Sequence, residues 1–148
     1  MKVGVDYIGV GVGAAIFNSE RKIFLMLRGA KAKNERGKWD CPGGAVEFGE
    51  TFEASLKREV REEHNVDIEV IELLGICDHI ISEEKQHWVA PTYICKIVKG
   101  EPEILEPEKC DEIGWFALDE AEQLPLTLTT SRDIQLLKKK YPEGYQIS

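Results

Sequence analysis

The sequence predicts an α/β protein, because stretches with strand periodicity precede and follow one strongly amphipathic helix. Residues 7–17 alternate between apolar and small side chains, which is the two-residue period of a half-buried strand. Residues 51–64 contain neither Gly nor Pro and repeat apolar side chains at helical spacing. Residues 67–81 and 88–98 are rich in β-branched and apolar residues, which favours two further strands.

Three glycines fall on one side of the first predicted strand. Ile8, Val10 and the later apolar residues point one way, whereas Gly9, Gly11 and Gly13 point the other. Glycine weakens a strand, so this side is expected to lie close to a packed neighbour or a ligand, with a packed neighbour as the commoner case.

The remaining elements follow from local signals. In the predicted helix, Phe52, Leu56 and Val60 recur every fourth residue along one side. Residues 18–21 form a turn, residues 29–40 a polar loop, residues 82–85 a polar connection and residues 101–112 an acidic loop with two prolines. The sequence further predicts strands over 23–27 and 113–116, a short helix over 118–124 and a last helix over 130–141.

Length, charge and cysteine spacing limit the class of protein. A chain of 148 residues without a linker or repeat predicts one domain over residues 1–148. The formal net charge of -8 argues against binding a nucleic-acid polymer or an anionic membrane. The four cysteines are widely spaced, which disfavours a zinc site or a disulfide framework. The first residues lack a signal-peptide core, and no run is long enough to span a membrane, so we expect a cytoplasmic location.

Three glutamates gather on one face of the predicted helix. Glu59 and Glu63 are four residues apart and Glu62 lies three residues from Glu59, so all three are neighbours on the helix surface. Such a run is usually a solvated face that pairs with nearby cations such as Arg58 or Arg61. Like charges at this spacing destabilise a helix, however, and a magnesium ion with its preference for oxygen ligands would relieve the repulsion.

The surrounding spacing decides between these interpretations. The segment from Gly43 to Val66 resembles the Nudix box: Gly, five residues, Glu, seven residues, Arg-Glu, an aliphatic residue, any residue, Glu-Glu, any residue, Gly and an aliphatic residue. The positions that match are Gly44, Glu50, Arg58, Glu59, Val60, Glu62, Glu63 and Val66. Asn65 replaces the family's Gly at the helix end, where Asn is the next-best residue for a left-handed conformation.

The resemblance implies a fold and a metal site. The fold is expected to be an α/β/α sandwich around a mixed central sheet. The family's metal ligands correspond here to Glu59, Glu62 and Glu63, with the carbonyl of Gly44 as a further ligand. The implied ion is Mg²⁺, with Mn²⁺ as an alternative. Glu50 and Arg58 resemble the family's structural ion pair between loop and helix.

A general base must take the proton of the attacking water. Some family members use a helix glutamate, and others use a glutamate of a distal loop. The acidic loop offers Glu106, Glu108 and Glu112, of which we select Glu108. The catalytic set expected from the sequence is therefore Glu59, Glu62, Glu63 and Glu108.

The substrate is expected to be a nucleotide. The chain resembles the MutT-related branch, which implies Mg²⁺-dependent cleavage of a normal or oxidised nucleoside triphosphate to a monophosphate and pyrophosphate. The alternatives are an ADP-ribose or nucleotide-sugar pyrophosphatase and a regulatory module that binds a nucleotide without turnover. Aromatic faces stack on bases, so Phe48, His87 and Trp88 are candidate substrate contacts beside Tyr7 and Trp115, although aromatic residues more often fill cores. A homodimer is compatible with the resemblance.

Overall fold

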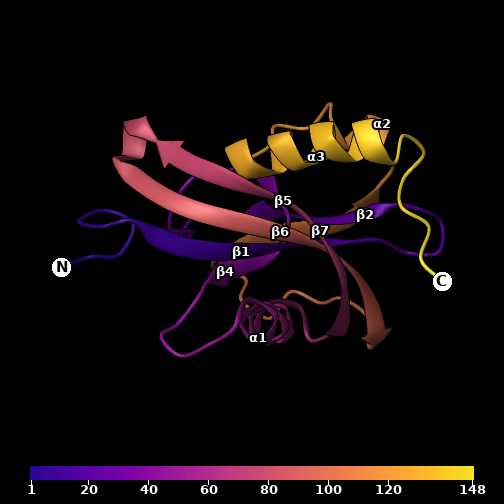
Figure 1. Ribbon diagram of the computed structural model, residues 1–148, viewed down its shortest axis with the longest axis horizontal. Helices are drawn as coiled ribbons and strands as arrows, with labels where there is room; N and C mark the ends of the chain where they lie inside the picture. The colour runs from indigo at the N-terminus through magenta and orange to yellow at the C-terminus, as the bar shows by residue number, and fades with distance from the viewer.

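The strands form the middle of the molecule and helices cover both sides, as a computed structural model describing residues 1–148 shows (Figure 1). Helix α1 lies on one side, and α2 and α3 lie on the other. The elements are β1 (Gly9–Ile16), β2 (Ile23–Arg28), β3 (Trp39–Asp40), β4 (Gly43–Ala45), α1 (Phe52–His64), β5 (Asp67–Ile81), η1 (Ser82–Glu84), β6 (Gln86–Lys99), β7 (Cys110–Phe116), α2 (Leu118–Ala121) and α3 (Leu128–Lys140). The predicted α/β/α arrangement is confirmed.

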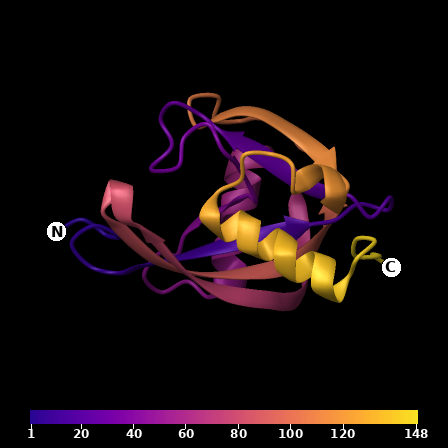
Figure 2. The same cartoon turned by 90° about the horizontal axis from the view of Figure 1, so that it is seen from above.

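The strands form two sheets. The larger has the order β4-β1-β6-β5, in which β1 and β6 run parallel and the other pairs run antiparallel, so it is mixed as expected. The smaller sheet, β3-β2-β7, is antiparallel throughout. Seen from above, α3 crosses over the strands (Figure 2), and it contacts both β5 and β3. One helix thus connects the two sheets.

Two apolar cores lie on the two sides of the strands. One joins α3 to the strands through residues such as Ile134, Leu137 and Leu25. The other joins α1 to the strands through Leu56 and Val60, which are the apolar residues at helical spacing. Because adjacent residues of β1 belong to different cores, both sides of this strand are buried near its end and α1 is fixed against it.

Both ends of α1 follow from their local sequence. The Thr51 side chain accepts a hydrogen bond from the backbone N–H of Ala54 and thereby caps the first turn. At the other end, Asn65 adopts the left-handed conformation with φ 56° and ψ 39°. Asn65 therefore fulfils the helix-stop role that its position predicts.

The structure adds three short elements to those predicted by periodicity. Strands β3 and β4 contain two and three residues, too few for a period to be recognised. The polar connection forms the single turn η1. The long strands agree closely with their predicted ranges, and β5 covers residues 67–81 as expected.

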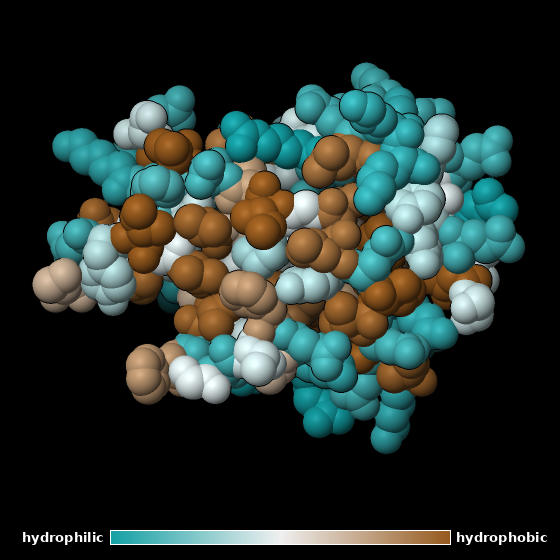
Figure 3. Space-filling model, in the orientation of Figure 1, coloured by the Kyte–Doolittle hydropathy of each residue, from teal (hydrophilic) through white to brown (hydrophobic).

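Some apolar side chains stay exposed on the outer side of the larger sheet. Leu73, Ile76 and Ile80 of β5 are 45%, 68% and 52% exposed. Hydrophobic residues gather over the middle of the face seen in Figure 3, where the strands of Figure 1 lie. None of the helices has the length and apolar character needed to cross a membrane.

Candidate active site

A cavity of about 370 Å³ opens between α1, the larger sheet and the N-terminal end of α3. This volume lies in the range of small-molecule sites. Strand β1 contributes Gly11 and Gly13, and β4 contributes Gly43 and Gly44, so backbone rather than side chain forms much of one wall. The glycine side of β1 therefore faces the cavity, except at Gly9, where an added Cβ would lie 2.5 Å from the ring of Trp88.

Two glutamates of α1 form the acidic end of this cavity. Glu63 accepts a hydrogen bond at 3.3 Å from the backbone N–H of Gly43. Burial, and next the charge of Glu59, raise the pKa of Glu63 to about 8. Glu59 rests against Gly44, where an added Cβ would lie 2.4 Å from the carboxylate carbon. Burial also raises the pKa of Glu59. Both carboxylates thus face the cavity, and burying their negative charges costs free energy that a bound cation would offset.

Arg58 binds the glutamates on the outer side of this cluster. Its Nε and Nη2 donate to the two carboxylate oxygens of Glu50 at 2.7 and 2.8 Å, and these hydrogen bonds lower the pKa of Glu50 to about 2. Its Nη1 donates to Glu59 at 3.0 Å and to Glu62 at 3.3 Å. Glu62 keeps a side chain that is 57% exposed and does not line the cavity. Arg58 therefore ties the loop before α1 to the glutamate face.

The acidic loop before β7 is fixed to the C-terminal end of α1. The backbone N–H groups of Glu103 and Leu105 donate to the carbonyls of His64 and Glu63 at 2.9 and 3.0 Å. These bonds satisfy carbonyls that a helix end would otherwise leave unpaired. They direct Glu106 into the cavity, where its negative charge contributes to the raised pKa of Glu63.

Glu108, the base selected from the sequence, does not line the cavity. Its carbonyl instead accepts from the N–H of Lys31, and so its backbone joins two loops. Glu106 and Glu108 belong to the same polar loop, in which no period defines which side chain points inward. Of the two residues, Glu106 rather than Glu108 lines the cavity.

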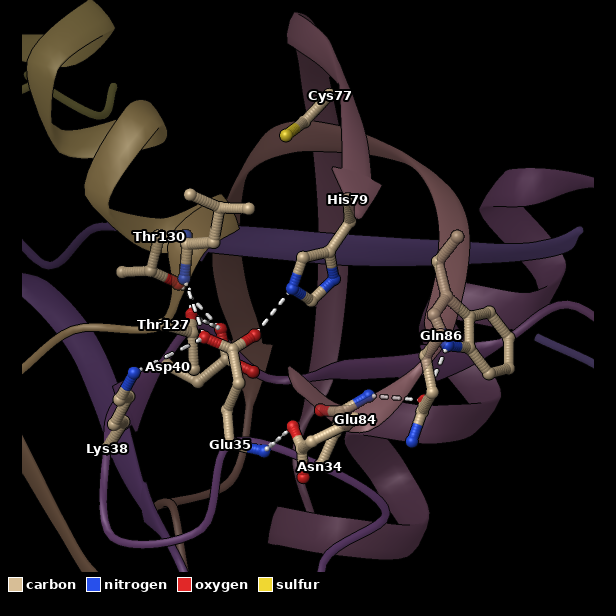
Figure 4. A network of polar contacts seen from close by, with 12 residues as sticks. Asn34, Glu35, Lys38, Asp40, Cys77, His79, Glu84, Gln86, Thr127 and Thr130 are labelled. Carbon is tan, nitrogen blue, oxygen red and sulfur yellow. Dashed lines mark hydrogen bonds and ion pairs between the residues drawn. The ribbon is translucent and has the colours of Figure 1, made fainter. Parts of the chain in front are cut away.

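The opposite end of the cavity is polar and largely buried. Asp40 accepts hydrogen bonds from the hydroxyls of Thr127 and Thr130 at 2.7 and 2.6 Å. Asp133 of α3 accepts from the Thr92 hydroxyl at 2.9 Å, and burial raises its pKa to about 7. Figure 4 shows Asp40 and both threonines within a network that continues to the loop before β3. This end thus presents the carboxylates of Asp40 and Asp133 together with the threonine hydroxyls that donate to them.

The aromatic residues proposed as substrate contacts differ in whether they line the cavity. Trp88 lines the cavity, is 7% exposed and donates through Nε1 to Gln86 at 2.9 Å. Phe48 is fully exposed, and His87 does not line the cavity. Tyr7 is 48% exposed, and Trp115 packs edge to face on Phe24 in the core. Of the five candidates, the structure brings only Trp88 to the cavity.

The donor set at the acidic end suits a divalent cation. Glu63 has no partner among the basic side chains, although its carboxylate is buried beside that of Glu59. Carboxylate and carbonyl oxygens are the ligands that Mg²⁺ and Mn²⁺ prefer. No group of three His, Cys, Asp or Glu side chains converges closely enough to hold a metal, because Glu62 is turned toward Arg58. The residues that fit a metal are therefore Glu59 and Glu63, together with the half-buried backbone of Gly44.

Several residues that line the cavity carry no recognisable signal in the sequence. Asp40, Asp133 and Thr92 come from three different elements, and Lys31 and Lys33 lie in a loop that the sequence predicts only as polar. The one local pattern that could have indicated them is Lys31-Ala32-Lys33, in which two lysines flank a small apolar residue. Contacts between distant elements leave no local pattern, so these positions could not be found from spacing.

Comparison with known proteins identifies the family. The NUDIX domain family matches residues 8–139 of the chain. The crystal structure of a MutT Nudix hydrolase from Burkholderia pseudomallei is 39% identical, with a TM-score of 0.80, and the match covers 88% of this chain and 98% of that one.

Curated relatives share this domain within longer proteins. The 8-oxo-dGDP phosphatase NUDT18 of Danio rerio is 35% identical over 68% of this chain and 28% of its own length. An ADP-ribose pyrophosphatase of Methanocaldococcus jannaschii is 33% identical over 58% of this chain and 50% of its own length. The chain thus spans half or less of these two relatives. The family match over most of the chain, together with the box glutamates at the cavity, shows that the chain belongs to the Nudix hydrolase family.

Proposed function

We propose that this protein hydrolyses a phosphoanhydride bond of a nucleoside triphosphate, normal or oxidised, and releases a nucleoside monophosphate and pyrophosphate. The reaction would depend on Mg²⁺, with Mn²⁺ as an alternative ion. The observation that carries the proposal is the buried carboxylate of Glu63, which faces the cavity beside Glu59 without a cationic partner. A protein of net charge -8 that binds an anionic substrate needs a local cation at this point.

The metal would be held by Glu59 and Glu63 with the Gly44 carbonyl, and Glu62 would join them by leaving Arg58. When bound, such an ion neutralises charge on phosphate oxygens and lowers the pKa of a bound water. Arg58 would keep Glu59 in place through its bonds to Glu50 and Glu59. Its contribution is positional, because it contacts the glutamates rather than the cavity.

The proton of the attacking water needs an acceptor. Glu106 is our choice, because its side chain lines the cavity near Glu59 and Glu63 and comes from a loop fixed to the end of α1. The oxygen of a water molecule would form a bond to phosphorus while the anhydride bond to the departing pyrophosphate breaks. The proton of that water would pass to the Glu106 carboxylate. Trp88, the aromatic side chain that lines the cavity, would contact the nucleoside beside the phosphate chain.

A second candidate substrate class is a nucleoside diphosphate joined to a sugar. The likeness to an ADP-ribose pyrophosphatase favours it, as does the Streptococcus suis ADP-ribose pyrophosphatase structure, which is 25% identical with a TM-score of 0.69. The same acidic end would bind either diphosphate. The polar end, with Asp40 and Asp133, would then face a sugar instead of a base.

Product analysis tests the proposal. The protein is incubated with Mg²⁺ and normal or oxidised nucleoside triphosphates, 8-oxo-dGDP, ADP-ribose and nucleotide sugars, with Glu63→Gln as the control variant. Release of monophosphate and pyrophosphate that the variant abolishes supports the triphosphate reaction. Turnover of only ADP-ribose or a nucleotide sugar would overturn the substrate but keep the catalytic residues. Nucleotide binding without any turnover would instead favour a regulatory module.

A homodimer is part of the proposal. Its support is the row of exposed Leu73, Ile76 and Ile80 on β5, an edge strand of the larger sheet. Light scattering after size exclusion should give twice the mass of one chain, and Ile76→Lys should reduce it to the monomer. A monomeric wild-type protein would contradict this part alone.

A further inference from the structure

The loop between β2 and β3, residues 29–38, places two unpaired lysines at the cavity. Lys31 and Lys33 line the cavity and are exposed, whereas Ala32, Asn34 and Glu35 between and after them are buried. Neither lysine forms an ion pair. The loop thus has buried anchors that leave Lys31 and Lys33 without a carboxylate partner, while the Lys33 ammonium lies over the ring of Trp88.

Glu35 is the central anchor of this loop. One of its carboxylate oxygens contacts Nε2 of His79 on β5 at 2.5 Å, and the other accepts from the N–H of Leu128 in the first turn of α3 at 2.9 Å. Figure 4 shows the Glu35 side chain reaching from the loop toward His79. Burial by itself would raise the pKa of Glu35, but the bonds from His79 and Leu128 outweigh it and the pKa ends below its ordinary value. Glu35 therefore fastens the loop as a carboxylate to two other elements.

A second set of contacts fixes the tip of the loop. Asn34 donates to the Gln86 side chain at 3.0 Å and accepts from Arg28 at 3.1 Å. The Gln86 amide in turn donates to the carbonyl of Lys33 at 3.2 Å. The Lys33 ammonium then lies 5.3 Å from the ring centre of Trp88. The backbone of Lys33 is thereby held at its carbonyl, and the next residue, Asn34, is held by its side chain.

The other cations around the cavity already have partners. Arg28 pairs with Asp40 at 3.2 Å, and Lys109 pairs with Glu106 at 3.4 Å. The carboxylates of Glu59 and Glu63 line the same cavity. Lys31 and Lys33 are thus the positive groups that remain available to a phosphate chain that enters the cavity. Lysine binds phosphate as a mobile point charge, so this role suits a loop that is fixed by its backbone.

We infer that the loop over residues 29–38 is an anion clamp in which Lys31 and Lys33 bind the phosphate chain of the substrate, while Glu35 positions the loop through His79 and Leu128. This inference rests on the proposed hydrolysis of a nucleotide. It assigns the lysines to substrate binding and Glu35 to positioning, since Glu35 makes its contacts to other parts of the protein.

The lysines are tested first, with Lys31→Gln and Lys33→Gln alone and together. Each single change should raise KM about tenfold and leave kcat within about twofold, because a hydrogen bond to a charged group is lost without touching the acidic end. Lys99→Gln is the matched control, since Lys99 is exposed on β6 away from the cavity. Unchanged KM in the double variant would overturn the clamp.

Glu35 is tested through its dependence on the lysines. Glu35→Ala in the wild-type background should raise KM by a factor similar to that of the double lysine variant. In the background lacking both lysines it should change KM no further, because residues acting through one contact are not additive. Glu35→Gln, which keeps a hydrogen-bond acceptor for Leu128, should restore part of the affinity and guards against a folding defect. Glu69→Gln is the control, because the Glu69 side chain is 58% exposed and pairs with Lys96 on the neighbouring strand, outside the cavity.

A purely structural role for Glu35 would give a different pattern. It would lower the melting temperature and kcat equally in both backgrounds, and that result would overturn the positioning role. Calorimetric titration with inorganic tripolyphosphate separates the clamp from catalysis. Loss of its binding in the double lysine variant supports the clamp even if no nucleotide is hydrolysed. Equal tripolyphosphate affinity of both proteins, beside normal hydrolysis by the wild type, would overturn the clamp and leave the proposed function intact.

Discussion

The backbone N–H of Gly43 donates to Oε1 of Glu63 across 3.3 Å, which joins β4 to α1 over 20 residues of sequence. This bond aims a buried carboxylate at the cavity. It leaves the carboxylate with one backbone donor and the repulsion of Glu59, so the pKa of Glu63 stays raised to about 8 by burial and by that neighbour. Such a side chain lowers the stability of the fold, and the divalent cation of the proposed reaction would offset that cost.

Glu63→Gln is expected to abolish most of the hydrolysis while the fold survives. Gln retains the shape and the acceptor for Gly43 but loses the charge that would hold a divalent ion. Loss of such an electrostatic group typically lowers kcat about 100- to 1000-fold. Pyrophosphate release measures the effect, and the rise in melting temperature on adding Mg²⁺ should disappear with it. Glu62→Gln should lower kcat less than Glu63→Gln does, because the Glu62 side chain is 57% exposed and lies outside the cavity. Equal losses in the two variants would contradict this ranking.

Arg58→Lys is expected to lower activity although the charge is kept. Lysine has a single ammonium, so it cannot reproduce the two bonds to Glu50 together with the bond to Glu59. Glu59 and the loop before α1 that carries Glu50 should then shift, and a displacement of roughly 1 Å can lower the rate about 100-fold. Steady-state kinetics would show the loss mainly in kcat. Wild-type kcat in Arg58→Lys would mean that the paired geometry is unimportant.

The local parts of the site could be predicted from the sequence because their causes are local. Four-residue spacing places Glu59 and Glu63 on one helix face, and the left-handed preference of Asn65 ends that helix where expected. The same reasoning located β5 within its observed range. Each of these features depends on neighbouring residues alone.

The other half of the cavity depends on contacts between elements far apart in the chain. Glu35 meets His79 across 44 residues, and no periodicity links two such positions. Which glutamate of the acidic loop faces inward is decided by the bonds from Glu103 and Leu105 to the end of α1, and these direct Glu106 rather than Glu108. Residue type alone did not distinguish the five aromatic candidates. In the structure, the indole ring of Trp88 packs against Gly9, where a larger residue would leave no room for the ring.

Gly44→Ala tests how closely the Glu59 carboxylate rests on the backbone. An added Cβ would lie 2.4 Å from the carboxylate carbon, so the flexible end of Glu59 must move. We expect the melting temperature to change little and kcat to fall, since the displaced atoms belong to a proposed metal ligand. Gly13→Ala is the control on the same strand-lined side of the cavity, because its Cβ would meet the Thr92 hydroxyl at an ordinary 3.5 Å and contacts no proposed metal ligand. Equal activity of the two variants would show that the position of Glu59 is not critical.

Asp133 should make the free energy of unfolding fall as pH rises. Burial raises its folded pKa from 3.8 to about 7, so the folded protein binds this proton more tightly than the unfolded chain does. Below pH 3.8 the carboxyl is neutral in both states and costs nothing. Between pH 3.8 and 7 the cost grows, by about 1.36 kcal/mol for each unit of pKa difference, and above pH 7 it is complete and constant.

Asp133→Asn should remove this dependence, because the amide oxygen can still accept from Thr92 and carries no charge. Urea unfolding at several pH values should give equal stabilities for variant and wild type near pH 4 and a more stable variant above pH 7. Asp119→Asn, whose side chain is 84% exposed, controls for the change in net charge. A constant difference between Asp133→Asn and wild type across this range would mean that Asp133 titrates alike in the folded and unfolded chain, and that the polar end of the cavity is better hydrated than its burial indicates.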